Sequence, residues 1–273
     1  SIQELFAPTL RFIMIVGITL GILQQVTGIN AIYFYATSIF KQTGIGTDAA
    51  FSSGVLLSFT TVVFTLLAIY LIDRMGRRPL LLVGMSGIAV SLLLCAYSFN
   101  QATYQLTAAE INSFENIDTY KLAEFQDVTY ESDVAFKNDI KEAIGNQVYA
   151  LNEGAILEAA INMNATLVLI GILGFIACFA FSLGPVMWVM LSEIFPNRYR
   201  GLAIGVIGFI NSFSSWLIQQ IFPWEISNLG SALTFFIYGL IATVGLLLFI
   251  KILPETKGKS LEQIEKELVK TKV

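Results

Sequence analysis

The chain contains six apolar stretches that are each long enough to cross a lipid bilayer, and this restricts its fold more than any other feature. A helix needs about 20 apolar residues to span the hydrocarbon core. Backbone polar groups in lipid must bond within the protein, so stretches of this length are expected to be helices. With 55% hydrophobic and 13% charged residues, the chain is predicted to be an all-α, polytopic membrane protein. The stretches lie at about 10–40, 51–72, 79–99, 165–192, 202–224 and 229–252.

The first stretch is interrupted by polar residues in the run QQVTGIN, at positions 24–30. In a straight helix Gln25 and Asn30 would point about 140° apart, so they could not bind one small ligand together. A helix break near residues 27–28, at Gly28, would remove that restriction. Interrupted spans of this kind indicate a substrate site near the bilayer midplane in secondary transporters.

The fourth stretch carries a proline deep inside it, in the pair Gly184-Pro185. Proline removes a backbone hydrogen bond and commonly bends or breaks a helix. The sequence therefore predicts a second helix break, at Pro185.

Most basic residues of the connections and the tail fall on one side of the membrane if the six spans alternate in direction, while Lys41 and the segment 100–163 fall on the other. Because Lys and Arg are enriched on the cytoplasmic side, both termini are predicted to be cytoplasmic in a multi-pass protein of the plasma or inner membrane. The residues that carry this prediction are Arg11, Arg74, Arg77, Arg78, Arg198, Arg200, Lys257, Lys259, Lys266 and Lys270.

The segment 100–163 is predicted to be an acidic, extracytoplasmic insertion. It holds eleven Asp or Glu against three Lys, so the negative charge is local and gives no reason to expect nucleic-acid binding. Apolar residues at helical spacing, at positions 140, 144, 148, 151, 155, 156 and 159, predict amphipathic helices. We interpret the insertion as a solvated cap over the outer mouth, with sugar gathering or partner binding as the alternative.

The predicted domain layout follows from these segments. The first three spans occupy 1–99, the insertion 100–163 and the last three spans 164–252. A cytoplasmic tail occupies 253–273 and contains a short amphipathic helix beginning after Ser260.

Several classes of chemistry lack the residues they need. The chain has no His and only two Cys, each inside an apolar run, and no paired carboxylates lie within the spans. An intramembrane enzyme would need a convergent nucleophile, acid pair or metal cluster. No catalytic residues, metal ligands or cofactors are therefore predicted.

Four blocks of sequence, taken in order, resemble the C-terminal half of the sugar-porter family of the major facilitator superfamily. This family contains bacterial xylose and galactose proton symporters and animal facilitative glucose transporters. The resemblance implies a six-helix bundle with a 3+3 inverted repeat. The blocks are QQVTGIN at 24–30, DRMGRRP at 73–79, GPVMWVMLSEIFP at 184–196 and PETKG at 254–258.

The resemblance also implies two sets of functional residues. Family positions that hold the sugar match Gln24, Gln25, Asn30, Phe179, Gly184, Trp188 and Asn211. A charge network that latches the cytoplasmic helix ends matches Asp73, Arg77, Arg78, Glu193 and Arg200. Phe34 replaces one of two outer-gate tyrosines found in many members, and Thr61 replaces a frequent sugar-contacting Asn.

By resemblance, we expect monosaccharide transport by alternating access, with a hexose such as glucose or a pentose such as xylose as substrate. Proton-coupled symport is the favoured mode, and the alternatives are a facilitative uniporter or a non-transporting sugar receptor. Family members have twelve spans, so the expected partners are the lipid bilayer and an N-terminal six-helix half absent from this sequence. The chain is interpreted as a fragment of a longer carrier or a split-gene product.

Overall fold

The structure is a computed structural model that describes residues 2–44, 47–114 and 117–268. Within these residues, six helical stretches are long and apolar enough to cross a membrane, which confirms the predicted all-α, polytopic class. The stretches are Arg11–Phe34, Ser52–Met75, Arg77–Asn100, Ala165–Ile194, Asn197–Asn228 and Gly230–Ile252.

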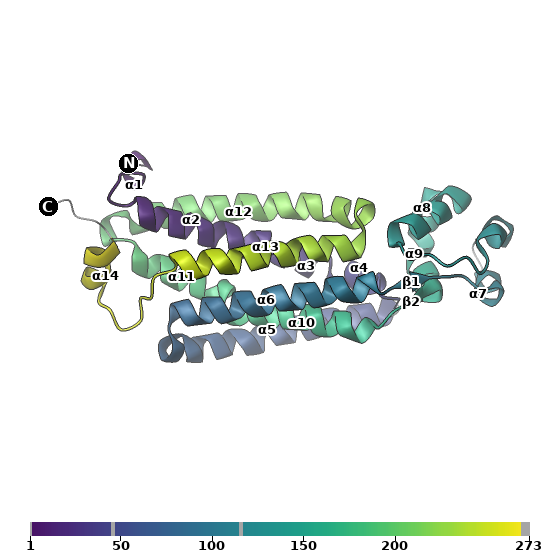
Figure 1. Ribbon diagram of the computed structural model, residues 1–273, viewed down its shortest axis with the longest axis horizontal. Coiled ribbons are helices and arrows are strands. Elements are labelled where there is room, and N and C mark those ends of the chain that lie inside the picture. Colours follow the sequence, from purple (N-terminus) through teal and green to yellow (C-terminus); the bar gives the residue numbers. More distant parts are fainter. Residues whose placement is uncertain (1, 45–46, 115–116, 269–273) are drawn as a thin grey trace.

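The molecule consists of a bundle of long helices with a smaller lobe at one end (Figure 1). The bundle contains α2 (Arg11–Val26), α3 (Ile29–Phe34), α4 (Ala36–Lys41), α5 (Thr47–Met75), α6 (Arg77–Asn100), α10 (Ala165–Phe181), α11 (Leu183–Ile194), α12 (Asn197–Asn228) and α13 (Gly230–Ile252). The short helices α1 (Ile2–Leu5) and α14 (Leu261–Leu268) lie at the opposite end from the lobe. We call the lobe end the outer end and the other the inner end.

The first span is broken twice. It leaves helical geometry at residues 27–28, where Gly28 has a φ of +89° and immediately precedes α3. A Cβ at Gly28 would approach the ring of Tyr238 to 3.0 Å, so both the backbone angle and the close packing favour glycine. A second break, which the sequence did not predict, lies at Tyr35 between α3 and α4.

The fourth span breaks at Ser182 instead of at Pro185, so the position predicted for this break was wrong. Ser182 has φ −127° and ψ −95° and separates α10 from α11. Pro185 is the third residue of α11. In the first turn of a helix the N–H groups have no partner within the helix, and proline is therefore tolerated there.

Small residues let the helices of the bundle approach closely. A Cβ at Gly84 of α6 would lie 1.8 Å from the Oγ of Ser182, and one at Gly171 of α10 would lie 2.4 Å from the Sγ of Cys95. Cys95 and Cys178 are both free thiols. Close approach at small residues is a principal source of helix association in membranes, and α6 packs in this way against α10.

The insertion folds around its own hydrophobic core. It contains β1 (Thr103–Tyr104), α7 (Ala108–Ser113), a 3₁₀ helix (Thr119–Phe125), α8 (Asp133–Ile144), α9 (Asn146–Ala160) and β2 (Ile161–Asn162). The two strands pair antiparallel, with Thr103 opposite Asn162, and so close the lobe at its base. Its core includes Leu106, Leu122, Phe136, Ile140, Ile156 and Leu157.

The buried face of α9 differs from the expected one. Leu151 is 81% exposed and Ala155 is also exposed, whereas Tyr149 and Leu157 are buried. Gly145, with a φ of +88°, separates α8 from α9. This break interrupts the helical register, so one periodic pattern could not predict the inward faces of both helices.

Candidate functional site

Four side-chain amides meet within the bundle, and we call them the amide network: Gln24, Gln25, Asn30 and Asn211. Gln25 Nε2 donates to Gln24 Oε1 and to Asn211 Oδ1, each at 3.2 Å. Asn30 Nδ2 donates to Gln25 Oε1 at 2.9 Å, and Asn211 Nδ2 donates to Gln24 Oε1 at 2.7 Å. The fold thus joins α2, α3 and α12, although Asn211 and Gln25 are 186 residues apart.

The amide nitrogens of the network all donate to protein oxygens. In contrast, Asn30 Oδ1 accepts no hydrogen bond from the part of the chain that the structure describes. Neutral hydrogen bonds contribute only about 1 kcal/mol each. A ligand hydroxyl, which both donates and accepts, could therefore exchange with them at small net cost.

Two further polar side chains of α12 extend the network. Asn30 Nδ2 donates to Ser215 Oγ at 2.7 Å, and Gln219 Nε2 donates to the same oxygen at 3.0 Å. Asn211 is the only residue of this helix predicted from the sequence to hold the sugar. The spacing of four between Asn211, Ser215 and Gln219 places them on one helix face, and this signal could have identified all three.

Asn30 lies between two cavities. The first, of about 270 Å³, is mainly polar and is lined by Gln25, Asn30, Asn211, Ser212, Ser215, Trp216, Gln219 and Gln220. The second, of about 490 Å³, is mainly apolar and is lined by Ile29, Asn30, Tyr33, Thr61, Thr65, Ile176, Phe179, Ala180, Gly184 and Pro185. Asn30 is therefore the predicted residue best placed to contact a ligand in either cavity.

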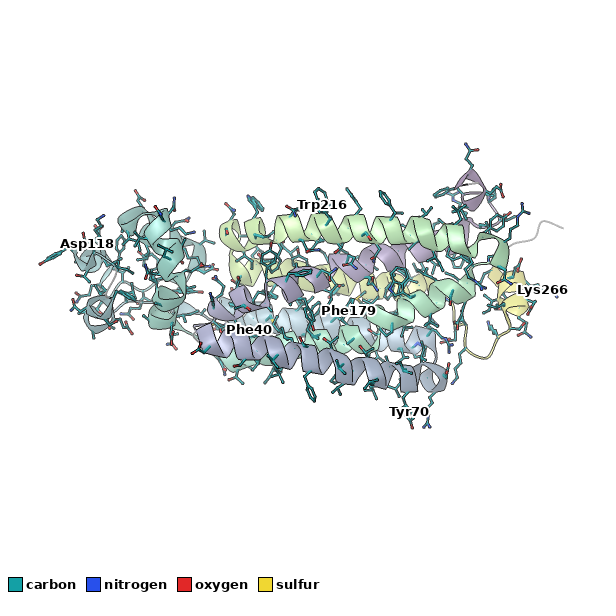
Figure 2. The ribbon with its side chains drawn as sticks, turned by 180° about the vertical axis from the view of Figure 1, so that it is seen from behind. Phe40, Tyr70, Asp118, Phe179, Trp216 and Lys266 are labelled. Carbon is teal, nitrogen blue, oxygen red and sulfur yellow. The ribbon has the colours of Figure 1, made fainter. Side chains whose placement is uncertain are left out.

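Of the remaining predicted site residues, two line a cavity and two do not. Phe179 and Gly184 line the second cavity, and Figure 2 shows Phe179 within the bundle, while Trp216 points outward from α12. Trp188 lines neither cavity and is 40% exposed. Gln24 also lines neither, and its Nε2 donates to the Leu183 carbonyl at 2.9 Å. Gln24 thus ties the broken first span to the start of α11.

The second cavity has one hydroxyl pair on its wall. Tyr33 Oη and Thr61 Oγ1 lie 3.0 Å apart, and Thr61 also donates to the Leu57 carbonyl at 2.9 Å. Both hydroxyls therefore have protein partners, which leaves this side of the cavity less polar than an asparagine at position 61 would.

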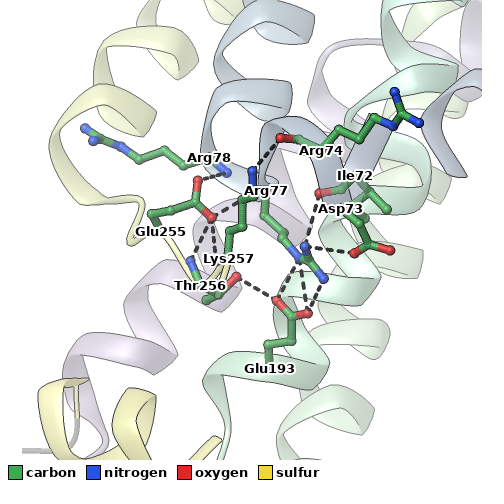
Figure 3. Close-up of polar contacts among 9 residues, drawn as sticks. All are labelled: Ile72, Asp73, Arg74, Arg77, Arg78, Glu193, Glu255, Thr256 and Lys257. Carbon is green, nitrogen blue, oxygen red and sulfur yellow. Dashed lines mark hydrogen bonds and ion pairs between the residues drawn. The ribbon is translucent and has the colours of Figure 1, made fainter. Parts of the chain in front are cut away.

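The inner end carries a cluster of charged and hydroxyl side chains, which we call the inner charge cluster: Asp73, Arg77, Glu193, Glu255 and Thr256 (Figure 3). Arg77 donates to Glu193 through Nε at 3.1 Å and through Nη2 at 2.8 Å. Thr256 Oγ1 donates to the same carboxylate at 2.6 Å, and Asp73 lies 3.2 Å from Arg77. Such paired geometry is among the stronger hydrogen-bonded arrangements in proteins.

Glu255 holds the start of α6 from the other side. Its carboxylate accepts from the backbone N–H groups of Arg77, at 3.2 Å, and Arg78, at 3.1 Å. A carboxylate is favourable at a helix N-terminus because the first N–H groups have no partner within the helix. Glu255 and Thr256 belong to the PETKG block, but the block gave no indication of these contacts.

Two arginines predicted for the latch bind backbone carbonyls. Arg78 donates to the Ile250 carbonyl at 2.9 Å, and Arg200 donates to the Phe195 carbonyl at 3.3 Å. Neither side chain pairs with a carboxylate within the described residues. Both therefore lie outside the ion pairs of the inner charge cluster, with backbone carbonyls as their partners.

The groups of the amide network and its cavities are neutral hydrogen-bonding side chains and aromatic rings. Among the described residues, no group of three or more His, Cys, Asp or Glu is placed to hold a metal ion. The arrangement suits a small, neutral ligand rich in hydroxyl groups, since amides match hydroxyls and aromatic rings pack on apolar faces.

Comparisons with known proteins agree with one another. The family model described as "Sugar (and other) transporter" matches residues 1–116 and 143–268. The chain is 32% identical to the arabinose-proton symporter of Bacillus subtilis over 270 residues, or 99% of this chain and 46% of the relative. It is 27% identical to the D-xylose-proton symporter of Escherichia coli over 259 residues, covering 93% of this chain and 40% of the relative.

A solved structure shares the fold. It is the major facilitator superfamily proton:xylose symporter bound to 6-bromo-6-deoxy-D-glucose, with a TM-score of 0.64 and 27% identity. The match covers 93% of this chain and 42% of that one. The chain thus spans less than half the length of the curated relatives that it matches.

Proposed function

The chain belongs to the sugar (and other) transporter family and has the fold of the major facilitator superfamily, and from this premise we propose that it is the C-terminal half of a monosaccharide carrier. In this proposal the complete carrier moves a pentose or hexose across the membrane by alternating access. Proton symport is the favoured mode, since the arabinose and xylose relatives are named as proton symporters.

The amide network is the observation that carries the proposal. It lies at the break of the first span and reaches the start of α11 through Gln24. Broken helices beside a central cavity are where secondary transporters bind substrate. The neutral side chains there suit a neutral sugar, with Gln25, Asn30 and Asn211 as its hydrogen-bonding partners and Phe179 and Gly184 on the cavity wall.

The inner charge cluster is proposed to control which side of the membrane the site faces. Arg77 and Glu193 would hold the inner helix ends together while the site is open to the outside. Arg78 and Arg200, whose side chains bind carbonyls here, would be available to the N-terminal half. The inner end would be cytoplasmic and the insertion extracytoplasmic.

Uptake by the complete carrier, containing this chain and its N-terminal half, tests the proposal. We expect uptake of at least one of labelled L-arabinose, D-xylose and D-glucose, and loss of accumulation when a proton uncoupler is added. Uptake that survives the uncoupler and only equilibrates would indicate a uniporter. Absence of uptake of all three sugars by a correctly assembled carrier would contradict the proposal.

The variant Asn30→Ala links that uptake to the amide network. It should abolish uptake, while Asn228→Ala, at the outer end of α12 and outside the cavity linings, should retain it. Equal uptake by the two variants would mean that sugar transport does not depend on the amide network.

A further inference from the structure

The insertion is fastened to the outer ends of the bundle by buried polar contacts. Asp133 Oδ2 accepts from the backbone N–H of Ser231 at 2.9 Å, and Lys137 donates to Gln42 Oε1. Gln42 Nε2 in turn donates to Glu153 at 3.4 Å. These contacts hold α8 and α9 over the ends of α4 and α13.

Close packing at Gly230 strengthens this attachment. Gly230, at the start of α13, has a φ of +82°. A Cβ there would lie 2.3 Å from Asp133 Oδ1, so any other residue would strain the backbone and displace the carboxylate. The position of α8 over the bundle therefore depends both on Asp133 and on the glycine at position 230.

A cavity of about 210 Å³ lies between the insertion and the bundle, and we call it the outer cavity. The insertion contributes Lys137, Lys141 and Glu153 to its wall. The bundle contributes, among others, Tyr35, Gln42, Phe222, Ser227, Ser231 and Phe235. Both the insertion and the bundle are therefore needed to form the cavity.

One wall group has no partner within the described residues. Ser231 is 2% exposed, and its buried Oγ makes no hydrogen bond there. A buried hydroxyl without a partner costs about 1–3 kcal/mol, and this one belongs to a residue that lines the cavity. Because that oxygen is closed to solvent, a ligand hydroxyl in the outer cavity would reach it only after the Ser231 side chain rotates.

The charges of the outer cavity nearly balance. Lys137 is 4% exposed and already contacts Gln42 and Asp133, the latter at 3.5 Å. Lys141 and Glu153 contribute one charge of each sign. Because the buried lysine already has a carboxylate and an amide as partners, the cavity is better suited to a neutral, polar ligand than to an anion.

Aromatic rings of the bundle also line the outer cavity. Tyr35 and Phe222 are stacked with their ring centroids 5.7 Å apart, and Phe235 lies on the same lining. Hydroxyl, amide and aromatic groups together match the polar edge and the apolar CH face of a sugar ring. Tyr35 also lies at the break between α3 and α4. It is five residues from Asn30, which corresponds to about 8 Å along a helix axis.

From these observations we propose that the outer cavity is a second monosaccharide site, which holds the sugar on its way to the amide network. The inference rests on the proposed function. It assigns to the insertion a role that the family match does not include, since that match omits residues 117–142, where Asp133, Lys137 and Lys141 lie.

The test separates the two sites in the complete carrier. Saturation-transfer NMR with D-xylose, L-arabinose and D-glucose is applied to the variant Asn30→Ala, which lacks the inner partner. A transfer signal should remain. It should be lost when Ser227→Trp, which fills the outer cavity, is added, and it should be retained when Asn228→Trp adds the same bulk one residue further along.

A milder variant keeps the test valid if Ser227→Trp fails to fold. Ser231→Ala removes the unpartnered hydroxyl without adding bulk and should weaken the residual binding about five-fold, as expected for one neutral hydrogen bond. Thermal melting of every variant verifies that it is folded.

The outcomes distinguish the two proposals. If wild type gives a signal that Asn30→Ala alone abolishes, the transport proposal stands and the outer site is refuted. A residual signal that neither Ser227→Trp nor Ser231→Ala reduces also refutes the outer site. If wild type gives no signal with any of the three sugars, both proposals fail.

Discussion

The amide network and the inner charge cluster both join distant parts of the chain by hydrogen bonds, but they use opposite chemistry. The network consists of neutral amides that bind mostly one another beside open cavities. The cluster pairs a guanidinium with a carboxylate in two-point contact, at side-chain exposures of only 13% and 20%.

The chemistry of each region determines what it can do. Neutral bonds of about 1 kcal/mol exchange readily with ligand hydroxyls, whereas the charge-assisted, two-point bonds of a part-buried ion pair are stronger. The network is therefore suited to bind and release a ligand, and the cluster to hold one conformation against another. The following predictions test that division.

The largest expected effect is on the network. Asn30→Ala removes the side chain that lines both central cavities, and we expect sugar affinity of the complete carrier to fall about 100-fold, as for the loss of two or three hydrogen bonds. Equilibrium binding of labelled sugar measures this. The melting temperature should change little, because neighbouring amides can bond to water in the cavity.

The inner charge cluster should show the reverse behaviour. Glu193→Gln keeps the shape of the side chain but removes the charge that pairs with Arg77, so we expect the inward-facing population to rise about ten-fold, equivalent to roughly 1.4 kcal/mol. Labelling of a cysteine placed at Asn197, in a background without Cys95 and Cys178, measures inner-side accessibility. Glu262→Gln, at an exposed carboxylate on α14, is the matched control, and equal labelling of both variants would argue against the latch.

A smaller effect is expected where α12 extends the network. Ser215→Ala leaves the donors of Asn30 and Gln219 without their shared oxygen, and sugar affinity should fall about five-fold. The same binding assay measures it. A loss as large as that of Asn30→Ala would mean that α12, and not the broken first span, contributes most of the binding energy.

The smallest effect concerns the insertion and pH. Burial lowers the pKa of Lys137 from its ordinary 10.5, although Asp133 and Glu153 oppose the shift. The folded protein thus binds fewer protons at this site than the unfolded chain does, so stability should rise as the pH increases from the lowered pKa towards 10.5. The melting temperature should rise less with pH for Lys137→Met than for wild type. An equal rise in both proteins would contradict the lowered pKa of Lys137.

The sequence predicted the six spans because long apolar stretches have only one stable form in lipid. It could not place every break. Pro185 marked the right region of the fourth span, but proline is tolerated in the first turn of α11, and the chain bends at Ser182 instead. Nothing in the apolar pattern near Tyr35 indicated the second break of the first span.

The site residues, too, could be predicted from the sequence only in part. The amides were conspicuous because polar groups are rare inside spans, and the fold brings all four together. The contacts of Arg77 with Glu193 and of Thr256 with Glu193 depend on how three helix ends meet, which no local pattern encodes. Trp188, assigned to the pocket by resemblance, lines neither central cavity in this half.

The central claim is that the amide network of this chain is where the sugar binds. A structure of the complete carrier with its transported sugar bound tests it most directly. We predict the sugar within hydrogen-bonding distance of Asn30 and of at least one of Gln25 and Asn211, with Phe179 on the cavity wall. A sugar bound only by the N-terminal half, with the hydrogen bonds of the amide network unchanged, would contradict the account.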